Sequence, residues 1–372
     1  MIEMCDLHGQ YSDIKDEIDR AISEVLSSCR FIRGESVAAF EQELAKYLGV
    51  RNVIGVGNGT DALQIALMSL GLHPGDEVIT PTFTFIATAE VVALLRLKPV
   101  VVDVDYDTMT VTAEAIERAI TPRTRAIVPV HLFGQNADME GILDVARCHG
   151  IPVIEDACQS LGSSYTFSNG ITRKSGTMGT IGCTSFFPSK NLGCYGDGGA
   201  LFTDDDTLAA RIRMIANHGM SIRYHHDMVG VNSRLDTIQA SVLRVKLPHL
   251  DEYVAARQQA AQAYCEALKG NSNILLPSVN PKSTHSFHQF TLRCTGISRD
   301  ALKAHLAEAG IPSMIYYPIP LHRQKAYLTE GDFPNADILS SQVLSIPMHT
   351  SLTSSVINTI TLAINGTTSF SL

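Results

Sequence analysis

The strongest constraint on the fold is a series of apolar runs between residues 52 and 154, none of which leaves one face polar. Strands that are apolar on both faces need cover on both sides, as they have in a parallel sheet packed between helices. Helix-patterned segments of about 10 to 20 residues separate the runs, and this alternation is typical of an α/β fold with a mostly parallel sheet. The runs span 52–56, 77–80, 100–104, 126–130 and 151–154.

Helical patterns lie between and before these strands. The spacing of apolar residues predicts helices over 60–70 and 139–149. The segment 36–49 carries an apolar stripe and ends at Gly49, a residue suited to a C-terminal cap. Helices of this kind would cover the faces of the predicted sheet.

The second part of the chain has a different pattern. A long helical stretch over 233–268 is broken at Pro248 and leads into short strands such as 287–293 and a helix near 300–309. Few runs there resemble buried parallel strands, which favours a smaller α+β unit. The predicted domains are a large one over 1–250 and a small one over 251–372.

Composition narrows the location and the partners. A formal net charge of −9 disfavours binding to DNA or to an anionic membrane, and no apolar run has the roughly 18 to 20 residues that span a bilayer. The N-terminus lacks a secretory pattern, so a cytoplasmic location is expected. The eight cysteines show neither a C-x-x-C pair nor zinc-ligand spacing, which favours free thiols and disfavours a metal site.

A glycine-rich turn between a predicted strand and a predicted helix is a candidate anion site. In NVIGVGNGTDALQIAL, Gly55, Gly57 and Gly59 precede a helix expected to start near Thr60. Unpaired N–H groups at a helix N-terminus bind phosphate, and glycines let it approach the backbone. The spacing matches neither a P-loop nor G-x-G-x-x-G, and no acid ends the next strand, which disfavours a nicotinamide dinucleotide. An ordinary tight turn is the alternative.

Two other segments place an acid or aromatic rings at the ends of predicted strands. Asp156 ends an apolar run in IPVIEDACQS, at the sheet edge where α/β proteins bind ligands. Its carboxylate could sit under a protonated ring nitrogen, or it could be a helix N-cap or a surface group. Phe83 and Phe85 follow another strand, and either could belong to the core.

A lysine in a confined loop completes the set of candidate residues. Lys190 lies in SFFPSKNLGCYGDGG, behind two aromatic residues and a proline and ahead of a glycine-rich tract. Lysines usually lie on the surface. Together with an anion site, an aromatic ring and a strand-end aspartate, however, this lysine matches what pyridoxal phosphate needs, namely a Schiff-base amine, a partner for the ring nitrogen and a phosphate site. A partly desolvated ammonium also has a lowered pKa and can reach the nucleophilic neutral form.

Several short segments of the chain resemble one known family. GNGTDAL, PTFTFIATAE, EDACQS, SFFPSKNLG, GDGGA, NSRLD and YPIPLH occur in this order and resemble the DegT/DnrJ/EryC1/StrS nucleotide-sugar aminotransferases over about residues 5–350. The resemblance implies the fold-type I architecture of pyridoxal phosphate enzymes. It also implies a large domain around a mixed seven-stranded sheet, a small C-terminal domain, and a homodimer with active sites at the subunit interface.

The resemblance assigns roles to individual residues. Lys190 corresponds to the Schiff-base lysine and Asp156 to the partner of the pyridine nitrogen. Gln159 corresponds to a residue beside the phenolic oxygen of the cofactor, and Phe85 to the ring stacked on its face. The phosphate-binding and remaining cofactor-binding positions are Gly59, Thr60, Ser185 and Asp61.

One cofactor contact is expected to come from the neighbouring subunit. Asn232 matches an asparagine that reaches the phosphate across the dimer, which implies that a monomer is inactive. The alternative for this segment is structural, because Ser233 and Asp236 form an S-x-x-D pattern that could cap a helix. The two interpretations are compatible.

The resemblance also suggests a substrate. CTSFFPSKNLGCYGDGG, NHGMSIRYHH and VGVNSRLDTIQA are most similar to enzymes that aminate C3 of UDP-2-acetamido-2-deoxy-3-oxo-glucuronate, with glutamate as the usual donor, on a route to bacterial surface polysaccharides such as O-antigen. Cationic and donor groups could meet the uronate carboxylate or the diphosphate, although a solvated basic loop is the alternative. These groups are Arg223, Tyr224, His225 and His226, and the expected small-domain residues at the sugar are Tyr317 and His322.

The sequence leaves other functions open. The substrate could be another UDP- or dTDP-linked 3- or 4-keto-sugar. A pyridoxal phosphate sugar dehydratase would carry histidine in place of Lys190, and a noncatalytic regulatory relative would not need the complete cofactor set. A nicotinamide dehydrogenase is disfavoured by the glycine spacing. The run 165–180 is longer than the compact loop typical of the family, so the rim of the cleft is expected to differ.

Overall fold

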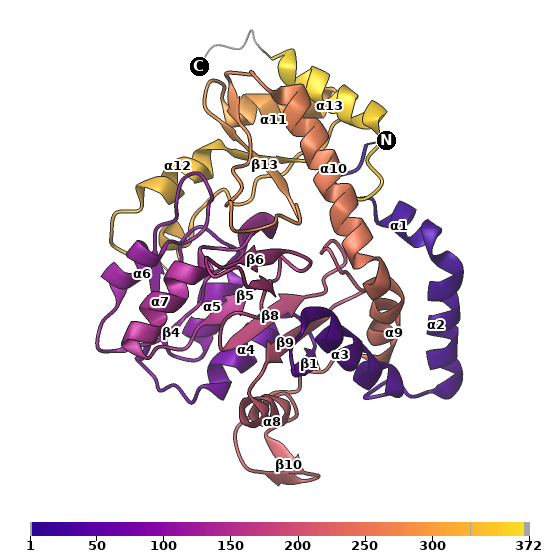
Figure 1. Ribbon diagram of the computed structural model, residues 1–372, viewed down its shortest axis with the longest axis vertical. Coiled ribbons are helices and arrows are strands. Elements are labelled where there is room, and N and C mark those ends of the chain that lie inside the picture. The colour runs from indigo at the N-terminus through magenta and orange to yellow at the C-terminus, as the bar shows by residue number, and fades with distance from the viewer. Residues whose placement is uncertain (1, 328, 368–372) are drawn as a thin grey trace.

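The computed structural model describes residues 2–327 and 329–367, and its centre is a mixed β-sheet (Figure 1). Two groups of strands, in the orders β1-β9-β8-β5 and β3-β2-β4, are joined by parallel bridges from Ile127 to Val153 and from Val130 to Asp156. The strands are β1 (Asn52–Val56), β2 (Glu77–Pro81), β3 (Lys98–Val102), β4 (Thr124–Ile127), β5 (Ile154–Asp156), β8 (Ile181–Ser185) and β9 (Gly199–Thr203).

The strand pairing confirms the predicted mixed, mostly parallel sheet. β2 pairs in parallel with β3 and β4, and β5 pairs in parallel with β8, whereas β9 is antiparallel to β1 and β8. Every residue of β2 and β9 is buried, as expected for strands covered on both faces. The predicted bounds of β1 are correct, but β5 starts at Ile154 and extends to Asp156, because residues before it make only isolated bridges.

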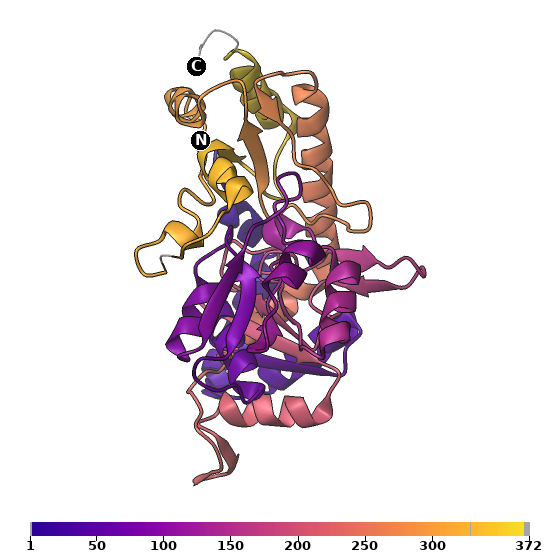
Figure 2. The same ribbon diagram turned by 90° about the vertical axis from the view of Figure 1, so that its left-hand side faces the viewer.

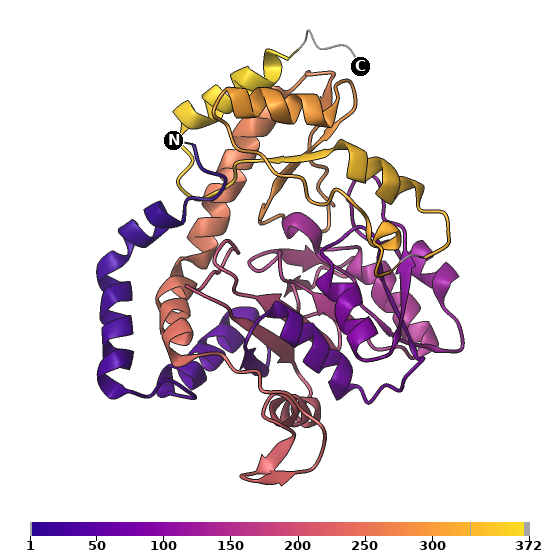
Figure 3. The same cartoon turned by 180° about the vertical axis from the view of Figure 1, so that it is seen from behind.

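Helices cover both faces of this sheet and form an outer layer near the N-terminus. α3 ends at Gly49, whose φ of 74° is the left-handed conformation that the predicted cap requires. α1 and α2 lie outside α9 along one side of the molecule (Figures 1 and 3). The helices of this part are α1 (Leu7–Asp13), α2 (Lys15–Ser28), α3 (Glu35–Leu48), α4 (Gly59–Ser69), α5 (Ala87–Leu94), α6 (Ala113–Ala119), α7 (Met139–His149), α8 (Asp206–Ile215) and α9 (Thr237–Lys246).

The C-terminal part packs around a small antiparallel sheet and has its own core. Pro248 lies in a short 3-10 turn between α9 and α10, where the sequence predicted a break. α10 gives Leu250 and Val254 to the core of the large part and Tyr264 to the C-terminal core. The elements are α10 (Leu250–Leu268), β12 (Ile274–Leu275), β13 (Phe290–Cys294), α11 (Arg299–Glu308), α12 (Pro334–Gln342), β14 (Val343–Ile346) and α13 (Ser354–Asn365). The division at residue 250 stays a prediction.

Two hairpins project from the large part (Figure 2). The first, β6 (Ser164–Thr166) with β7 (Thr172–Lys174), occupies the run 165–180. The second, β10 (Met220–Ile222) with β11 (His225–His226), lies at the end of the molecule opposite to the C-terminal part (Figure 1). No helix in the described part of the chain is long and apolar enough to cross a membrane.

A buried carboxylate fixes the turn that follows the first hairpin. Glu155 is fully buried and accepts hydrogen bonds from the backbone N–H groups of Gly176, Met178 and Gly179. His131 Nε2 lies 2.8 Å from the same carboxylate, while its Nδ1 accepts from a backbone N–H. That acceptor role leaves the ring proton on Nε2, which donates to Glu155. One side chain therefore ties the turn to the strand that carries Asp156.

We expect Glu155→Gln to destabilise the protein by about 3 kcal/mol, because the amide nitrogen would face N–H donors and leave at least one of them buried without an acceptor. Chemical denaturation followed by circular dichroism measures the change. The matched control is Glu117→Gln on the exposed side of α6, which should change stability by less than about 0.5 kcal/mol. Equal stability of the two variants would contradict the account.

Candidate active site

One cavity collects most of the residues singled out in the sequence. It has a volume of about 620 Å³ and lies where the large part meets the C-terminal part. From the predicted cofactor and sugar positions, its lining includes Gly59, Thr60, Asp61, Phe85, Asp156, Gln159, Ser185, Lys190 and Tyr317. Apart from Tyr317, which lies in a loop of the C-terminal part, these residues come from strand ends, from the loops that follow them and from the N-terminus of α4, as expected for a site at the edge of an α/β sheet.

Lys190 lies in the loop that follows β8 and lines the cavity. Its backbone N–H donates to the Phe187 carbonyl at 2.8 Å, which closes a tight turn around it. Burial lowers the pKa of the Lys190 amine below its ordinary value, against the opposing effects of Cys158 and Asp156. The loop therefore holds an amine with a raised tendency to lose its proton and become a nucleophile.

The glycine turn leads directly into α4, one residue earlier than predicted. Asn58 caps this helix by accepting the Asp61 N–H at 2.8 Å. A Cβ on Gly59 would lie 2.7 Å from the Ser185 side chain, so only glycine fits between the helix start and β8. A helix N-terminus that lines a cavity beside a serine and a threonine is a suitable place for a phosphate.

Asp156 is buried at the end of β5. Its carboxylate accepts hydrogen bonds from the Thr88 hydroxyl and from the Cys158 backbone N–H, both at 3.2 Å. Residues 158–162 form turns and no helix starts after Asp156, so the N-cap interpretation of Asp156 is wrong. The position suits a carboxylate that must face a ligand in the cavity.

An amide, that of Gln159, and two aromatic rings, those of Phe85 and Tyr317, also line the cavity. Gln159 accepts the Phe133 N–H at 2.8 Å and donates to the Tyr317 hydroxyl at 3.1 Å, so its amide orientation is fixed. Phe85 is half exposed at the cavity, with its ring 6.2 Å from that of Tyr317, whereas Phe83 is buried in the core. Of the two phenylalanines considered, only Phe85 is available to a ligand.

Several predicted residues lie outside this cavity. Asn232 is exposed and pairs with Asn217, and His322 is buried, with hydrogen-bond contacts to Thr82 and Asp337. A structural role therefore explains His322 in this chain. The exposed hairpin β10–β11 carries the predicted carboxylate-binding residues, and none of them lines the cavity: Arg223, Tyr224, His225 and His226.

The S-x-x-D helix cap predicted before α9 is wrong. α9 begins at Thr237 after Asp236, and no side chain caps it. Ser233 instead accepts the Gly57 N–H at 2.9 Å and donates to the Asp61 carboxylate at 2.6 Å. The Ser233 hydroxyl therefore bonds to the glycine turn, where the Gly57 N–H is its donor and the Asp61 carboxylate is its acceptor.

Sequence reasoning missed the part of the lining that comes from the C-terminal part. His288, Gln289 and Tyr316 line the cavity beside Tyr317, and the buried His288 Nδ1 has no hydrogen-bond partner within the described residues. The only signal was the run HSFHQF, residues 285–290, which overlaps the start of the strand predicted over 287–293. A polar run at a strand start is common, so the signal lacked specificity.

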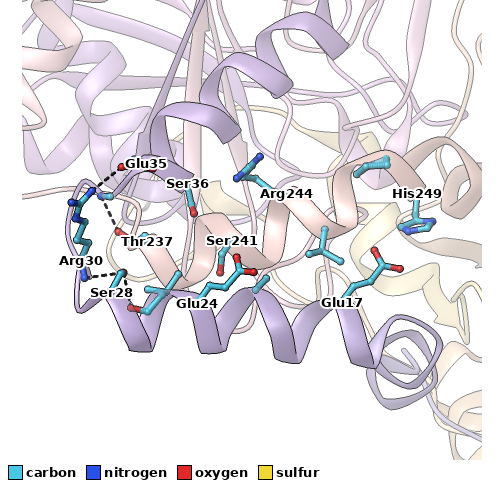
Figure 4. Close-up of a pocket in the computed structure, with 15 residues that line it drawn as sticks. Glu17, Glu24, Ser28, Arg30, Glu35, Ser36, Thr237, Ser241, Arg244 and His249 are labelled. Carbon is cyan, nitrogen blue, oxygen red and sulfur yellow. Dashed lines mark hydrogen bonds and ion pairs between the residues drawn. The ribbon is translucent and has the colours of Figure 1, made fainter.

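The residues of the cavity fit pyridoxal phosphate. They supply an enclosed amine with a lowered pKa, a buried carboxylate and a glycine-lined helix N-terminus that a Cβ would obstruct. No other cofactor considered above needs all three groups together. A second hollow of about 520 Å³ between α2 and α9 lacks this combination (Figure 4).

Comparison with known proteins decides the family. The model of the DegT/DnrJ/EryC1/StrS aminotransferase family matches residues 12–365. The chain belongs to this aminotransferase family. Its members use pyridoxal phosphate, so the protein is a pyridoxal phosphate-dependent aminotransferase, and the nicotinamide alternative is wrong.

Three curated relatives illustrate the family. UDP-2-acetamido-2-deoxy-3-oxo-D-glucuronate aminotransferase of Pseudomonas aeruginosa is 48% identical and covers 98% of this chain and 100% of its own. A pleiotropic regulatory protein of Geobacillus stearothermophilus is 46% identical over 93% of both chains. UDP-N-acetyl-3-dehydro-alpha-D-glucosamine 3-aminotransferase of Acidithiobacillus ferrooxidans is 47% identical, covering 93% of this chain and 92% of its own.

Solved structures agree with this assignment and confirm the fold-type I architecture. A DegT/DnrJ/EryC1/StrS aminotransferase from Brucella abortus superimposes with a TM-score of 0.93 at 42% identity, covering 98% of this chain and 99% of its own. NtdA from Bacillus subtilis with bound cofactor PMP gives a TM-score of 0.86 at 32% identity, covering 95% of this chain and 82% of its own.

The lowered pKa of Lys190 generates a prediction for the apoprotein. Trinitrobenzenesulfonate reacts with neutral amines, so its rate at Lys190, read by peptide mass spectrometry across a pH series, should reach half-maximum below pH 10.5. Exposed lysines in the same samples serve as the internal reference. If Lys190 titrated together with them, the enclosure of its amine would be disproved.

Proposed function

We propose that the protein transfers an amino group from glutamate to C3 of UDP-2-acetamido-2-deoxy-3-oxo-glucuronate, for bacterial surface polysaccharides such as O-antigen. The observation that carries the proposal is the full-length, 48% identical relative named for this substrate, combined with a cavity that holds Lys190 and Asp156 together. Another UDP- or dTDP-linked 3- or 4-keto-sugar is the alternative. A cytoplasmic location remains a prediction.

The residues of the cavity divide the work between binding and proton transfer. The cofactor, when bound, withdraws electrons from the reacting carbon and carries the amino group between substrates. Gly59, Thr60 and Ser185 would hold its phosphate, and Asp156 would pair with its ring nitrogen. Lys190 would tether its aldehyde and, once released by the donor, remove the proton from the α-carbon of glutamate. Gln159, held by Phe133 and Tyr317, would lie beside the phenolic oxygen of the cofactor, and Phe85 would stack on its ring.

We also propose a homodimer with shared active sites. The hairpin β10–β11 and its flanking loop expose Ile222, Tyr224 and Val229 by 69%, 75% and 85%, which is unusual for apolar or aromatic side chains unless a partner covers them. Asn232 and Arg223 lie in the same exposed region, outside their own cavity. A second copy could bring these residues to the cavity of the first, and two-fold symmetry would make the contribution reciprocal.

The substrate proposal predicts a selective effect of Arg223→Ala. With the 3-oxo-glucuronate nucleotide, kcat/KM should fall about tenfold or more, because a charge-assisted contact to the uronate carboxylate is lost. With the corresponding 3-oxo-glucosamine nucleotide, which lacks that carboxylate, the fall should be much smaller. Coupled assays with glutamate and each UDP-linked sugar measure both values. Equal losses would disprove carboxylate recognition by Arg223, and preference of the unaltered protein for the neutral sugar would reject the uronate as substrate.

Shared sites predict complementation between two inactive variants. Lys190→Ala lacks the reactive amine, and Asn232→Asp places a charge where a phosphate contact is expected. Co-expressed with different tags, the two chains form hybrid dimers in which one site regains both native residues, so transamination should reappear. Native mass spectrometry verifies that hybrids are present. Inactive hybrids would exclude the proposed contribution of Asn232 across the interface.

A further inference from the structure

A second lysine is buried behind the loop that carries Lys190. Lys246, at the end of α9, is 1% exposed and is among the largest fully buried side chains. Its amine donates to the Gly193 carbonyl at 2.7 Å and lies 5.1 Å from the centre of the Tyr195 ring. Within the described residues, no carboxylate lies within ion-pair distance of this amine. A buried cation without an acidic partner is costly, so its contacts with the loop need an explanation.

The same helix holds the loop at a further residue. Gln239 accepts the Tyr195 N–H at 2.8 Å and donates to the Tyr195 carbonyl at 3.3 Å. The loop in turn closes on itself, because the Cys194 N–H donates to the Phe186 carbonyl at 2.8 Å. α9 therefore binds the loop on both sides of Cys194: Lys246 bonds to Gly193 before it, and Gln239 bonds to Tyr195 after it.

The loop has little freedom to replace these contacts. A Cβ on Gly193 would lie 2.2 Å from the Pro188 carbonyl oxygen, so the chain crosses itself there at backbone distance. Pro188 and Gly193 flank Lys190, and a shift of the Gly193 peptide would move the turn that positions the lysine. Lys246 bonds to the Gly193 carbonyl, and Gly193 packs against Pro188 in the turn that carries Lys190, so the two lysines are connected through the loop backbone.

The segment that leads into α9 also supports the phosphate side of the cavity. Ser233 bonds to Gly57 and Asp61 at the glycine turn, as described above. A single stretch, Ser233 to Lys246, therefore contacts both the predicted phosphate site and the lysine loop. Its two ends therefore contact the two regions that flank the cavity, the glycine turn before α4 and the loop that carries Lys190.

We propose that Lys246 is a positioning residue that holds the Lys190 loop through the Gly193 carbonyl, and that it thereby controls retention of the cofactor. This inference rests on the proposed role of Lys190. Lys246 does not line the cavity, so it acts only through the loop.

The proposal differs from a purely structural role in its pH dependence. Burial lowers the pKa of Lys246 to about 8, against small opposing effects of the facing thiols of Cys194 and Cys5. Burial raises the pKa of both thiols, that of Cys194 to about 11, so they stay protonated near pH 8. Above about pH 8 Lys246 loses its charge, and its hydrogen bond to the Gly193 carbonyl loses its charge assistance.

The experiment compares Lys246→Met, which keeps the length of the side chain, with Arg244→Met as the matched control. Arg244 lies on the same helix but faces the hollow beside α2 and pairs with Glu43 (Figure 4). Cofactor release after dilution is followed by its visible absorption. The unaltered protein and Arg244→Met should release it faster as pH rises through about 8. Lys246→Met should release it about tenfold faster at pH 7, with no step near pH 8.

A second measurement uses the apoprotein and needs no bound cofactor. Hydrogen exchange of the peptide spanning residues 186–196 should be faster in Lys246→Met than in Arg244→Met, while peptides of β1 and β2 should exchange alike. Unchanged exchange and an unchanged pH step in Lys246→Met would overturn the proposal. If the unaltered protein bound no pyridoxal phosphate at all, the proposed function would fail instead, and the two failures are therefore distinguishable.

Discussion

The enclosure of the Lys190 amine is the constraint on which the site depends. An ammonium removed from water is destabilised, so a lysine in this position is useful only if its neutral form has chemistry to perform. Cys158 and Asp156 oppose this loss of charge, and the loop after β8 holds the side chain partly buried at the cavity. The sheet, the glycine turn and the C-terminal part all contribute groups around this one amine.

The cavity needs both parts of the chain. The large part supplies the strand ends and the helix N-terminus, whereas Tyr317, Tyr316 and His288 come from the C-terminal part. The connection between the two parts is specific, because Asn191, the neighbour of Lys190, donates to the Ser286 hydroxyl at 2.8 Å. Gln159 and Tyr317 form a second link. Relative movement of the two parts would therefore displace Asn191, the residue next to the reactive lysine.

The sequence predicted the elements with strong local patterns and missed those set by tertiary contacts. β1, α7 and the Gly49 cap were predicted correctly, because a buried strand, an amphipathic stripe and a positive-φ glycine each leave a local mark. The role of Ser233 was mistaken, since its partners at Gly57 and Asp61 lie far away in the sequence. The burial of Lys246 could not be predicted either, because the sequence pattern of an amphipathic helix is the same whether its last lysine faces water or a buried carbonyl.

The most direct test of the account is chemical mapping of the cofactor. Borohydride reduction of the protein with bound pyridoxal phosphate, followed by proteolysis and mass spectrometry, identifies the side chain to which the cofactor was attached. The account predicts one modified peptide, with the added mass on Lys190, and no such peptide from Lys190→Ala. Attachment to a different lysine, or a reduced protein that carries no cofactor mass, would contradict the central claim.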